Sequence, residues 1–239
     1  MCKNFILIKY AKSKFDRPVD EEMGNLYLRS QEEIFRKMVK QLTIQYPDSY
    51  IHVLTNEKML PVNNKMKIHK RDFEPNHLCK LLLYGLLTEP GLYLDADIII
   101  KRKFHPHELK SSNAFRMYNS IGRIDYSRFS RNLNCSIEHY NAGAIMIAEP
   151  SEELAKEMLQ IQEFFFSDKE FKMANGSWPY CDEHVASYYI HKNKWTIEPN
   201  NTVSLFYPTD NPDVQSVHHT GLDKRSFFLD FSITYTKLF

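Results

Sequence analysis

Two aspartates, Asp95 and Asp97, follow directly on the apolar run Gly91-Leu92-Tyr93-Leu94. In an extended chain, side chains two residues apart share one face. Two carboxylates on one face repel each other, and a cation between them stabilises the charged pair. Oxygen ligands suit hard ions such as Mg²⁺ or Mn²⁺, which are commonly held by one or two carboxylates together with substrate phosphates. The spacing therefore predicts a divalent-metal site, and Ala96 is small enough for a ligand to approach its backbone. The alternative is an aspartate pair that only caps a turn.

Three further segments later in the chain carry polar groups beside small residues. They are Tyr140-Asn141-Ala142-Gly143-Ala144, the pair Asp182-Glu183, and His218-His219-Thr220-Gly221-Leu222-Asp223-Lys224.

Taken together, these four segments resemble a known family. Tyr93-Leu94-Asp95-Ala96-Asp97 resembles the D-x-D signature of nucleotide-sugar glycosyltransferases with the GT-A fold, especially family eight, which includes glycogenin and bacterial galactosyltransferases. The other three segments resemble, in the same order, that family's N-A-G strand, its D-Q pair and its late H-x-x-G-x-x-K motif. The resemblance covers the chain from about Leu78 to Lys224, and four motifs in order are more specific than any one of them.

The resemblance implies a metal site and a donor site. Asp95, Asp97 and His218 would hold one Mn²⁺ (or Mg²⁺) ion on the diphosphate, with His219 as the rival imidazole. Lys80 stands where the family commonly has an arginine that touches the donor. The first strand would contact the base through Tyr10, and Arg225-Ser226 replaces the family's usual Pro-Trp after the late lysine. The residues expected to contact the donor are Tyr10, Lys80, Asp95, Ala96, Asp97, Asn141, Ala142, Gly143, Gly221 and Lys224.

Asp182 and Glu183 are the expected catalytic residues. By the resemblance, Asp182 would bind hydroxyls of the donor sugar or acceptor, and Glu183 stands where the family has a glutamine near the anomeric carbon. A carboxylate there could stabilise an oxocarbenium-like transition state, or act as a base or nucleophile. The alternative for both is helix capping, because acidic residues are favoured at a helix N-terminus.

The elements around these residues alternate between strands and helices. Apolar runs predict strands at Phe5–Ile8, Ile51–Leu54, Leu92–Leu94 and Asn141–Ile147, with a last one at Lys194–Ile197. Helices are expected after the capping box Ser30-Gln31-Glu32-Glu33, after Asn76, after Ser151, and from Asp182 through Ile190. Residues 102–136 are expected to form loops and short elements. The pattern predicts an α/β fold with a mixed, mainly parallel sheet flanked by helices, of the Rossmann-like GT-A type, in a single domain spanning residues 1–239.

Composition narrows the classes of function. Of 239 residues, 43% are hydrophobic, so a folded core is expected. Lys and Arg number 31 against 30 Asp and Glu, a balance that argues against a nucleic-acid partner. No apolar run approaches the roughly 20 residues that a membrane span needs. Four widely separated cysteines and a short apolar start suggest reduced thiols and a soluble, cytoplasmic protein.

The function expected from the residues and the resemblance is metal-dependent transfer of a hexose from a nucleoside diphosphate sugar, with UDP as the expected nucleotide, to a glycan or other hydroxyl acceptor, with retention at the anomeric carbon. Two alternatives remain. A haloacid dehalogenase-type phosphohydrolase also starts with an apolar strand and D-x-D, but it has that motif near the N-terminus and Thr or Val where this chain has Ile99. A noncatalytic relative would bind a sugar nucleotide without turning it over.

Overall fold

The computed structural model describes residues 3–9, 21–73, 77–101, 114–115, 123–125, 136–138, 143–169, 182–194, 196–197, 203–205, 216–219 and 225–237. The strands are β1 (Asn4–Lys9), β2 (Tyr50–Thr55), β3 (Met66–Lys70), β4 (Gly91–Leu94), β5 (Ile98–Ile100), β6 (Ala114–Phe115), β7 (Arg123–Asp125), β8 (Ser136–Glu138), β9 (Ala144–Ile147), β10 (Thr196–Ile197), β11 (Val203–Leu205) and β12 (Ser216–His218). The helices are α1 (Glu21–Gln45), η1 (His77–Gly85), α2 (Glu152–Ser167), α4 (Asp182–Asn193) and α5 (Arg225–Lys237).

The main sheet has seven strands in the order β10-β6-β9-β4-β1-β2-β3. β1 pairs in parallel with both β2 and β4, while β9 runs antiparallel to β4 and β6. The chain builds outward from β1 through β2 to β3 and then returns to the other side of β1 as β4. This reversal is the topological switch point of the sheet, where α/β folds bind ligands beyond the carboxyl ends of the strands. The predicted mixed, mainly parallel sheet is confirmed.

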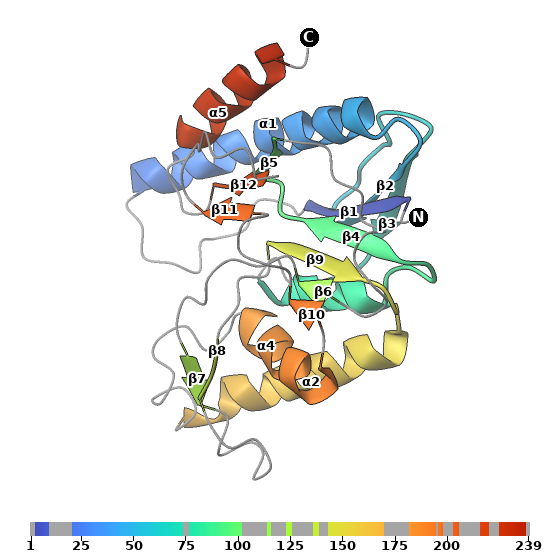
Figure 1. The fold of residues 1–239 in the computed structure, drawn as a ribbon, viewed down its shortest axis with the longest axis vertical. Helices are drawn as coiled ribbons and strands as arrows, with labels where there is room; N and C mark the ends of the chain where they lie inside the picture. Colours follow the sequence, from blue (N-terminus) through green and yellow to red (C-terminus); the bar gives the residue numbers. More distant parts are fainter. Residues whose placement is uncertain are drawn as a thin grey trace.

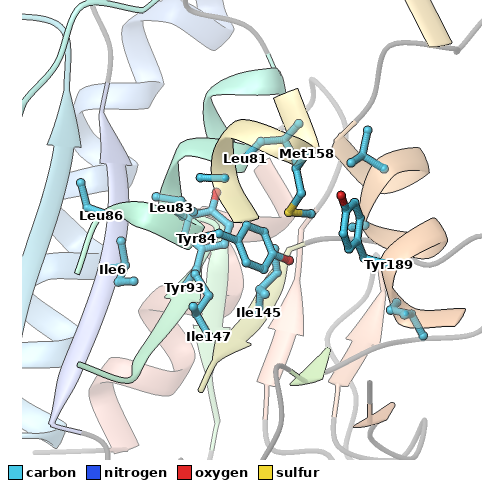
Figure 2. Close-up of a cluster of buried hydrophobic side chains, with 14 of the residues drawn as sticks. Ile6, Leu81, Leu83, Tyr84, Leu86, Tyr93, Ile145, Ile147, Met158 and Tyr189 are labelled. Atoms are coloured by element: carbon cyan, nitrogen blue, oxygen red, sulfur yellow. The ribbon is translucent and has the colours of Figure 1, made fainter. Parts of the chain in front are cut away.

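Alternation along the strands separates two apolar layers. Phe5 and Leu7 of β1 belong to the core beneath α1, whereas Ile6 between them belongs to the core beneath η1, α2 and α4. In Figure 1, α1 and α5 lie above the sheet, and α2 and α4 lie below it. Figure 2 shows the lower cluster, in which side chains of η1, β4, β9, α2 and α4 meet. Both faces of the sheet are therefore covered, as parallel sheets require.

The second sheet is small and joins distant parts of the chain. Its order is β11-β12-β5, with β12 parallel to β11 and antiparallel to β5. The side-chain amides of Gln41 and Gln45 on α1 donate to the carbonyl oxygen of Ile100 at 2.9 and 3.2 Å, which ties β5 to α1. The sequence analysis did not anticipate this sheet or the helix α5. They place the tail of the chain beside the residues that follow β4.

The first helix corrects the interpretation of Ser30 as an N-cap. α1 begins at Glu21, nine residues before Ser30, and Ser30 is buried within it. The S-x-x-E pattern is a local signal that a helix interior also tolerates, and the preceding Glu, Met and Leu residues are helix formers that extend the helix. In contrast, Ser151 does cap α2, since its side chain accepts a hydrogen bond from the backbone N–H of Leu154 at 3.2 Å.

The helix before the aspartates is a 3₁₀ helix rather than an α-helix. η1 is tightly packed against α2: a Cβ added at Gly85 would lie 2.9 Å from Cα of Glu152. The backbone N–H of Ser151 donates to the carbonyl of Tyr84 at 2.6 Å. Glycine is therefore required at position 85 by the close approach of two backbones. The predicted cap Asn76 lies outside the described residues.

The remaining predicted elements differ mainly in their ends. The expected strand at Asn141–Ile147 is β9, which covers Ala144–Ile147, and the one at Lys194–Ile197 is the two-residue β10. α4 runs from Asp182 three residues beyond the expected end. Within 102–136, the described β6 and β7 are short strands, as expected. No helix among the described residues is long and apolar enough to cross a membrane.

A histidine pair links β1, β2 and β3. His52 Nε2 lies 3.1 Å from Oδ1 of Asn4, and His52 Nδ1 lies 2.8 Å from Nε2 of His69. Because the Asn4 amide N–H donates to the carbonyl of Pro90, the Asn4 side-chain oxygen accepts a hydrogen bond from His52, which therefore carries a proton on Nε2. Burial, together with the positive charges of His69 and Lys67, lowers the pKa of His52 from 6.5 to about 4.

We predict that the free energy of unfolding falls as the pH drops from about 6.5 toward 4. A histidine whose pKa is depressed by folding binds a proton more readily in the unfolded chain, so acid favours unfolding over this window. The His52→Gln variant should show a smaller loss between pH 7 and 5 in urea titrations. His69→Gln, which changes the other ring of the pair, should also show a smaller loss, because burial lowers the pKa of His69 as well. Equal pH dependence in all three proteins would contradict this assignment.

Candidate functional site

The candidate site lies at the switch point of the sheet, where β1 and β4 end side by side. β1 ends at Lys9 and β4 ends at Leu94, so Asp95 is the first residue beyond the carboxyl end of β4. The Lys9 ammonium forms ion pairs with Glu57 and, at 3.1 Å, with Glu32. The two strands thus bring a paired lysine and the acidic segment to the same edge of the sheet.

Asp95 is held by contacts from three elements. Its backbone N–H donates to the carbonyl of Gly143 at 2.7 Å, just before β9. Its Oδ2 accepts from the Lys80 ammonium of η1 at 3.0 Å, and its Oδ1 accepts from the hydroxyl of Tyr93. Each carboxylate oxygen of Asp95 thus accepts a hydrogen bond from a different element, and these two hydrogen bonds fix its orientation. The structure therefore brings together three residues of the predicted site: Lys80, Asp95 and Gly143.

Lys80 also faces a second carboxylate. Its ammonium lies 3.7 Å from Oδ2 of Asp182, the first residue of α4, which is only 2% exposed. Burial acts to lower the pKa of Lys80, but Asp182 and Asp95 outweigh it and hold that pKa well above the usual value. Lys80 is therefore a permanent cation between two acidic groups.

Burial raises the pKa of Asp182 from 3.8 to about 7, against the opposing effect of Lys80 and with smaller contributions from Glu183 and Asp95 in the same direction. A carboxyl group with this pKa exchanges a proton near neutral pH, so it can donate or accept a hydrogen bond there. Perturbed pKa values of this kind are common at functional sites. The predicted pair Asp182-Glu183 thus lies at the N-terminus of α4, where helix capping was the alternative role, and Asp182 lies close to Lys80.

Asp97 is joined to the tail of the chain through the backbone. Its carbonyl accepts a hydrogen bond from the N–H of His219 at 3.1 Å, and in the β5–β12 ladder His218 is paired with Ile98, the residue after Asp97. The 120 residues that separate the two segments in sequence are therefore bridged by the small sheet. The side chain of His218 lies outside what the structure describes.

The rival imidazole, His219, is already engaged on both ring nitrogens. Nε2 lies 3.0 Å from Oδ2 of Asp230, and Nδ1 lies 3.1 Å from Oγ of Ser226. The residue is 1% exposed. His219 therefore cannot bind a metal ion without losing one of these partners, which favours His218 as the imidazole ligand.

A complete metal cluster is not visible in the described part of the chain: no group of three His, Cys, Asp or Glu side chains there could hold an ion. The donor set nevertheless suits a hard cation, because Asp95 and Asp97 supply carboxylate oxygens at the end of one strand. Ala96 lies between them and is half-buried. The predicted site residues Tyr10, Asn141, Ala142, Gly221 and Lys224 lie outside the described residues.

Sequence reasoning missed two residues that orient the site. Tyr93, which donates to Asp95, precedes it by two positions, so the two-residue period of a strand already placed both side chains on one face. Asp230 lies on α5 among Phe227, Phe231 and Thr234, all of them buried. Their spacing is helical, and a carboxylate within such a buried stripe signals a buried partner.

The fold is shared with glycosyltransferases of known structure. The glycosyltransferase GlyE of Streptococcus pneumoniae TIGR4 superposes with a TM-score of 0.56 at 14% identity over 99% of this chain and 62% of its own. The bifunctional glycosyltransferase WbbM gives 0.52 at 11% identity, over 98% of this chain and 49% of its own. A glycosyltransferase involved in glycosylation of the major capsid of PBCV-1 gives 0.50 at 13% identity, over 99% and 100%.

At these identities the likeness establishes the fold, which is of the GT-A type. The chain spans about three fifths of the length of GlyE and about half of WbbM. No family model matches the sequence, and no curated protein matches it. The predicted fold class is confirmed, whereas nothing in these comparisons singles out family eight.

Replacing Lys80 by methionine should destabilise the protein by about 3–5 kcal/mol at pH 8, because removing one partner of a buried pair leaves uncompensated charge. The loss should be smaller at pH 6, where Asp182 takes up a proton. The double variant Lys80→Met/Asp182→Asn should recover part of the stability in urea unfolding.

The matched control is Lys192→Met, since Lys192 and Glu157 form an ion pair 2.7 Å long between α4 and α2 with side chains 42% and 44% exposed. An exposed pair contributes at most about 1 kcal/mol. Equal losses in the Lys80→Met and Lys192→Met variants would show that the Lys80 charge is not needed at the sheet edge.

Proposed function

We propose that the chain is a metal-dependent glycosyltransferase that transfers a hexose from a nucleoside diphosphate sugar, with UDP as the expected nucleotide, to a hydroxyl of a glycan or another acceptor. One observation carries the proposal: within a GT-A-type fold, Asp95 at the switch point binds Lys80, which also faces Asp182. Two residues further on, the Asp97 carbonyl accepts from the N–H of His219, directly after the β12 strand that ends at His218. The order of motifs along the sequence supports the same reading.

The residues suited to hold the ion are Asp95, Asp97 and His218. Carboxylate oxygens and an imidazole suit Mn²⁺, and Mg²⁺ is the alternative. When bound, such an ion supplies charge neutralisation for the leaving diphosphate. Because the acceptor positions of Asp95 are partly taken by Tyr93 and Lys80, its carboxylate has a fixed orientation before any ligand arrives.

The other proposed donor contacts follow from charge and size. Lys80 is a permanent cation near the acidic segment and offers a point charge to the diphosphate, in place of the two-pronged contact an arginine would make. Lys224 and Gly221 are proposed to contact phosphate, and Tyr10 the base. Asn141, Ala142 and Gly143 are proposed to line the sugar, and the Gly143 carbonyl is already bonded to Asp95.

Asp182 and Glu183 are the proposed catalytic residues. Asp182, with its pKa near 7, can hydrogen-bond a sugar hydroxyl as donor or acceptor. Glu183 follows it at the start of α4, where it is partly exposed and can face the anomeric carbon as a stabilising carboxylate, a base or a nucleophile. The resemblance to family eight favours retention of configuration.

A phosphohydrolase of the haloacid dehalogenase type is less consistent with the molecule. That class has its aspartates after the first strand, whereas here they follow β4. The strand order and the antiparallel β9 are those of a fold shared with glycosyltransferases. The position of the two aspartates in the strand order therefore argues against a phosphohydrolase of this type.

Isothermal titration with UDP should show binding that depends on Mn²⁺. The Asp97→Asn variant should bind UDP at least about tenfold more weakly in the presence of Mn²⁺, a loss of roughly 1.4 kcal/mol or more. Asp48→Asn, an equal change of charge on an exposed turn, should leave the affinity unchanged. If UDP, GDP and ADP all fail to bind the wild-type protein with Mn²⁺ present, the proposal is wrong.

Release of UDP from UDP-sugars, followed over hours, tests catalysis separately from binding. Glu183→Gln should lower kcat on the order of 10²-fold, the usual contribution of a positioned acid or base, while UDP still binds. Glu157→Gln on the exposed face of α2 is the control and should retain full activity. Binding without any turnover by the wild type would identify a noncatalytic sugar-nucleotide-binding relative instead.

A further inference from the structure

A buried histidine–aspartate pair connects α5 to the segment that carries the proposed metal ligands. His219 Nε2–H donates to Oδ2 of Asp230 at 3.0 Å, and both residues are 1% exposed. The hydroxyl of Ser226, on the first turn of α5, lies 3.1 Å from the other ring nitrogen. The imidazole is therefore fixed at both ends by one helix.

The same aspartate reaches the far end of β5. Asp230 forms an ion pair with Lys101, the residue directly after β5, and the Lys101 ammonium also donates to Oγ1 of Thr234 at 2.9 Å. Asp230 thus holds a cation from β5 and an imidazole from the end of β12. The two strands pair with each other. β5 begins directly after Asp97, and β12 ends at His218.

The connection continues through the backbone to Asp97. The N–H of His219 donates to the Asp97 carbonyl at 3.1 Å. His218, the residue before His219, is the last residue of β12 and is paired with Ile98 of β5. A rotation of the His219 backbone would therefore displace both Asp97 and His218.

Apolar packing makes this arrangement rigid. Ile99 of β5, Ile34 of α1, and Phe227 and Phe231 of α5 form one buried cluster. The ring of Phe227 lies edge-on to the His219 ring at 5.8 Å between centroids. Ser226, His219 and Asp230 are linked as in a hydrolytic triad. Because the apolar cluster shields the imidazole from solvent and substrate, these three residues do not act as one.

We propose that His219 and Asp230 are positioning residues, which hold Asp97 and His218 in the geometry that binds the divalent ion, so that α5 is part of the metal site. This inference rests on the proposed function, since it assumes that an ion binds Asp97 and His218. Residues that orient metal ligands from behind typically change metal affinity by 10- to 100-fold when they are replaced.

The test is a Mn²⁺ titration of the full chain followed by electron paramagnetic resonance, with and without UDP. His219→Leu and Asp230→Asn should each weaken Mn²⁺ binding by about 10- to 100-fold. His219→Gln, which keeps an N–H for Asp230, should recover most of the affinity. Leu229→Ala is the matched control, because Leu229 is 60% exposed on the same helix, and it should bind Mn²⁺ as the wild type does.

The folded fraction of each variant, measured by circular dichroism at the titration temperature, separates positioning from stability. If affinity falls only in proportion to the folded fraction, or if His219→Leu and Asp230→Asn bind Mn²⁺ as the wild type does, the inference is wrong while the proposed function stands. If His219→Leu does not fold, the comparison of Asp230→Asn with His219→Gln decides by the same criterion. Absence of Mn²⁺ binding by the wild type would overturn the proposed function itself.

Discussion

Negative charge gathered at one edge of a covered sheet is the constraint on which this molecule depends. Asp95 and Asp182 come from different elements and converge on the single ammonium of Lys80. One positive charge between two carboxylates leaves the group net negative when both are ionised. Burial, together with the negative charges of Glu183 and Asp95, raises the pKa of Asp182 to about 7. Binding an anionic diphosphate at this edge of the sheet requires further positive charge. A divalent ion and a nucleotide are therefore expected to bind together.

The fold meets this constraint with parts from both ends of the chain. The switch point between β1 and β4 delivers the acidic segment, η1 delivers Lys80, and α4 delivers Asp182 at its N-terminus. In the small β11-β12-β5 sheet, β12 near the end of the chain pairs with β5, next to the acidic segment. α5 holds the end of β12 in place through the hydrogen bond between Asp230 and His219. The glutamines of α1 that bind Ile100 hold the same region from the other side.

The sequence predicted the parts whose signals are local. Buried parallel strands such as β1 and β4 contain continuous apolar runs, and Ser151 caps its helix by contacts within four residues. The start of α1 could not be derived from the pattern at Ser30, because a helix interior accommodates the same residues. The β5–β12 pairing depends on tertiary contacts between segments about 120 residues apart, so no local pattern predicts it. The family resemblance implied only that His218 would lie near the two aspartates. The spacing of Phe227, Asp230, Phe231 and Thr234 is helical and could have indicated α5, but their burial, and with it the pairing of Asp230 with His219, is known only from the structure.

The account is tested most directly by diffraction from crystals grown with UDP and Mn²⁺, with anomalous data collected at the manganese edge. The account predicts one strong anomalous peak beside the diphosphate, within direct coordination distance of the Asp97 carboxylate and the His218 imidazole, with Lys80 nearby. A peak bound elsewhere, or a UDP molecule bound away from the ends of β1 and β4, would contradict it.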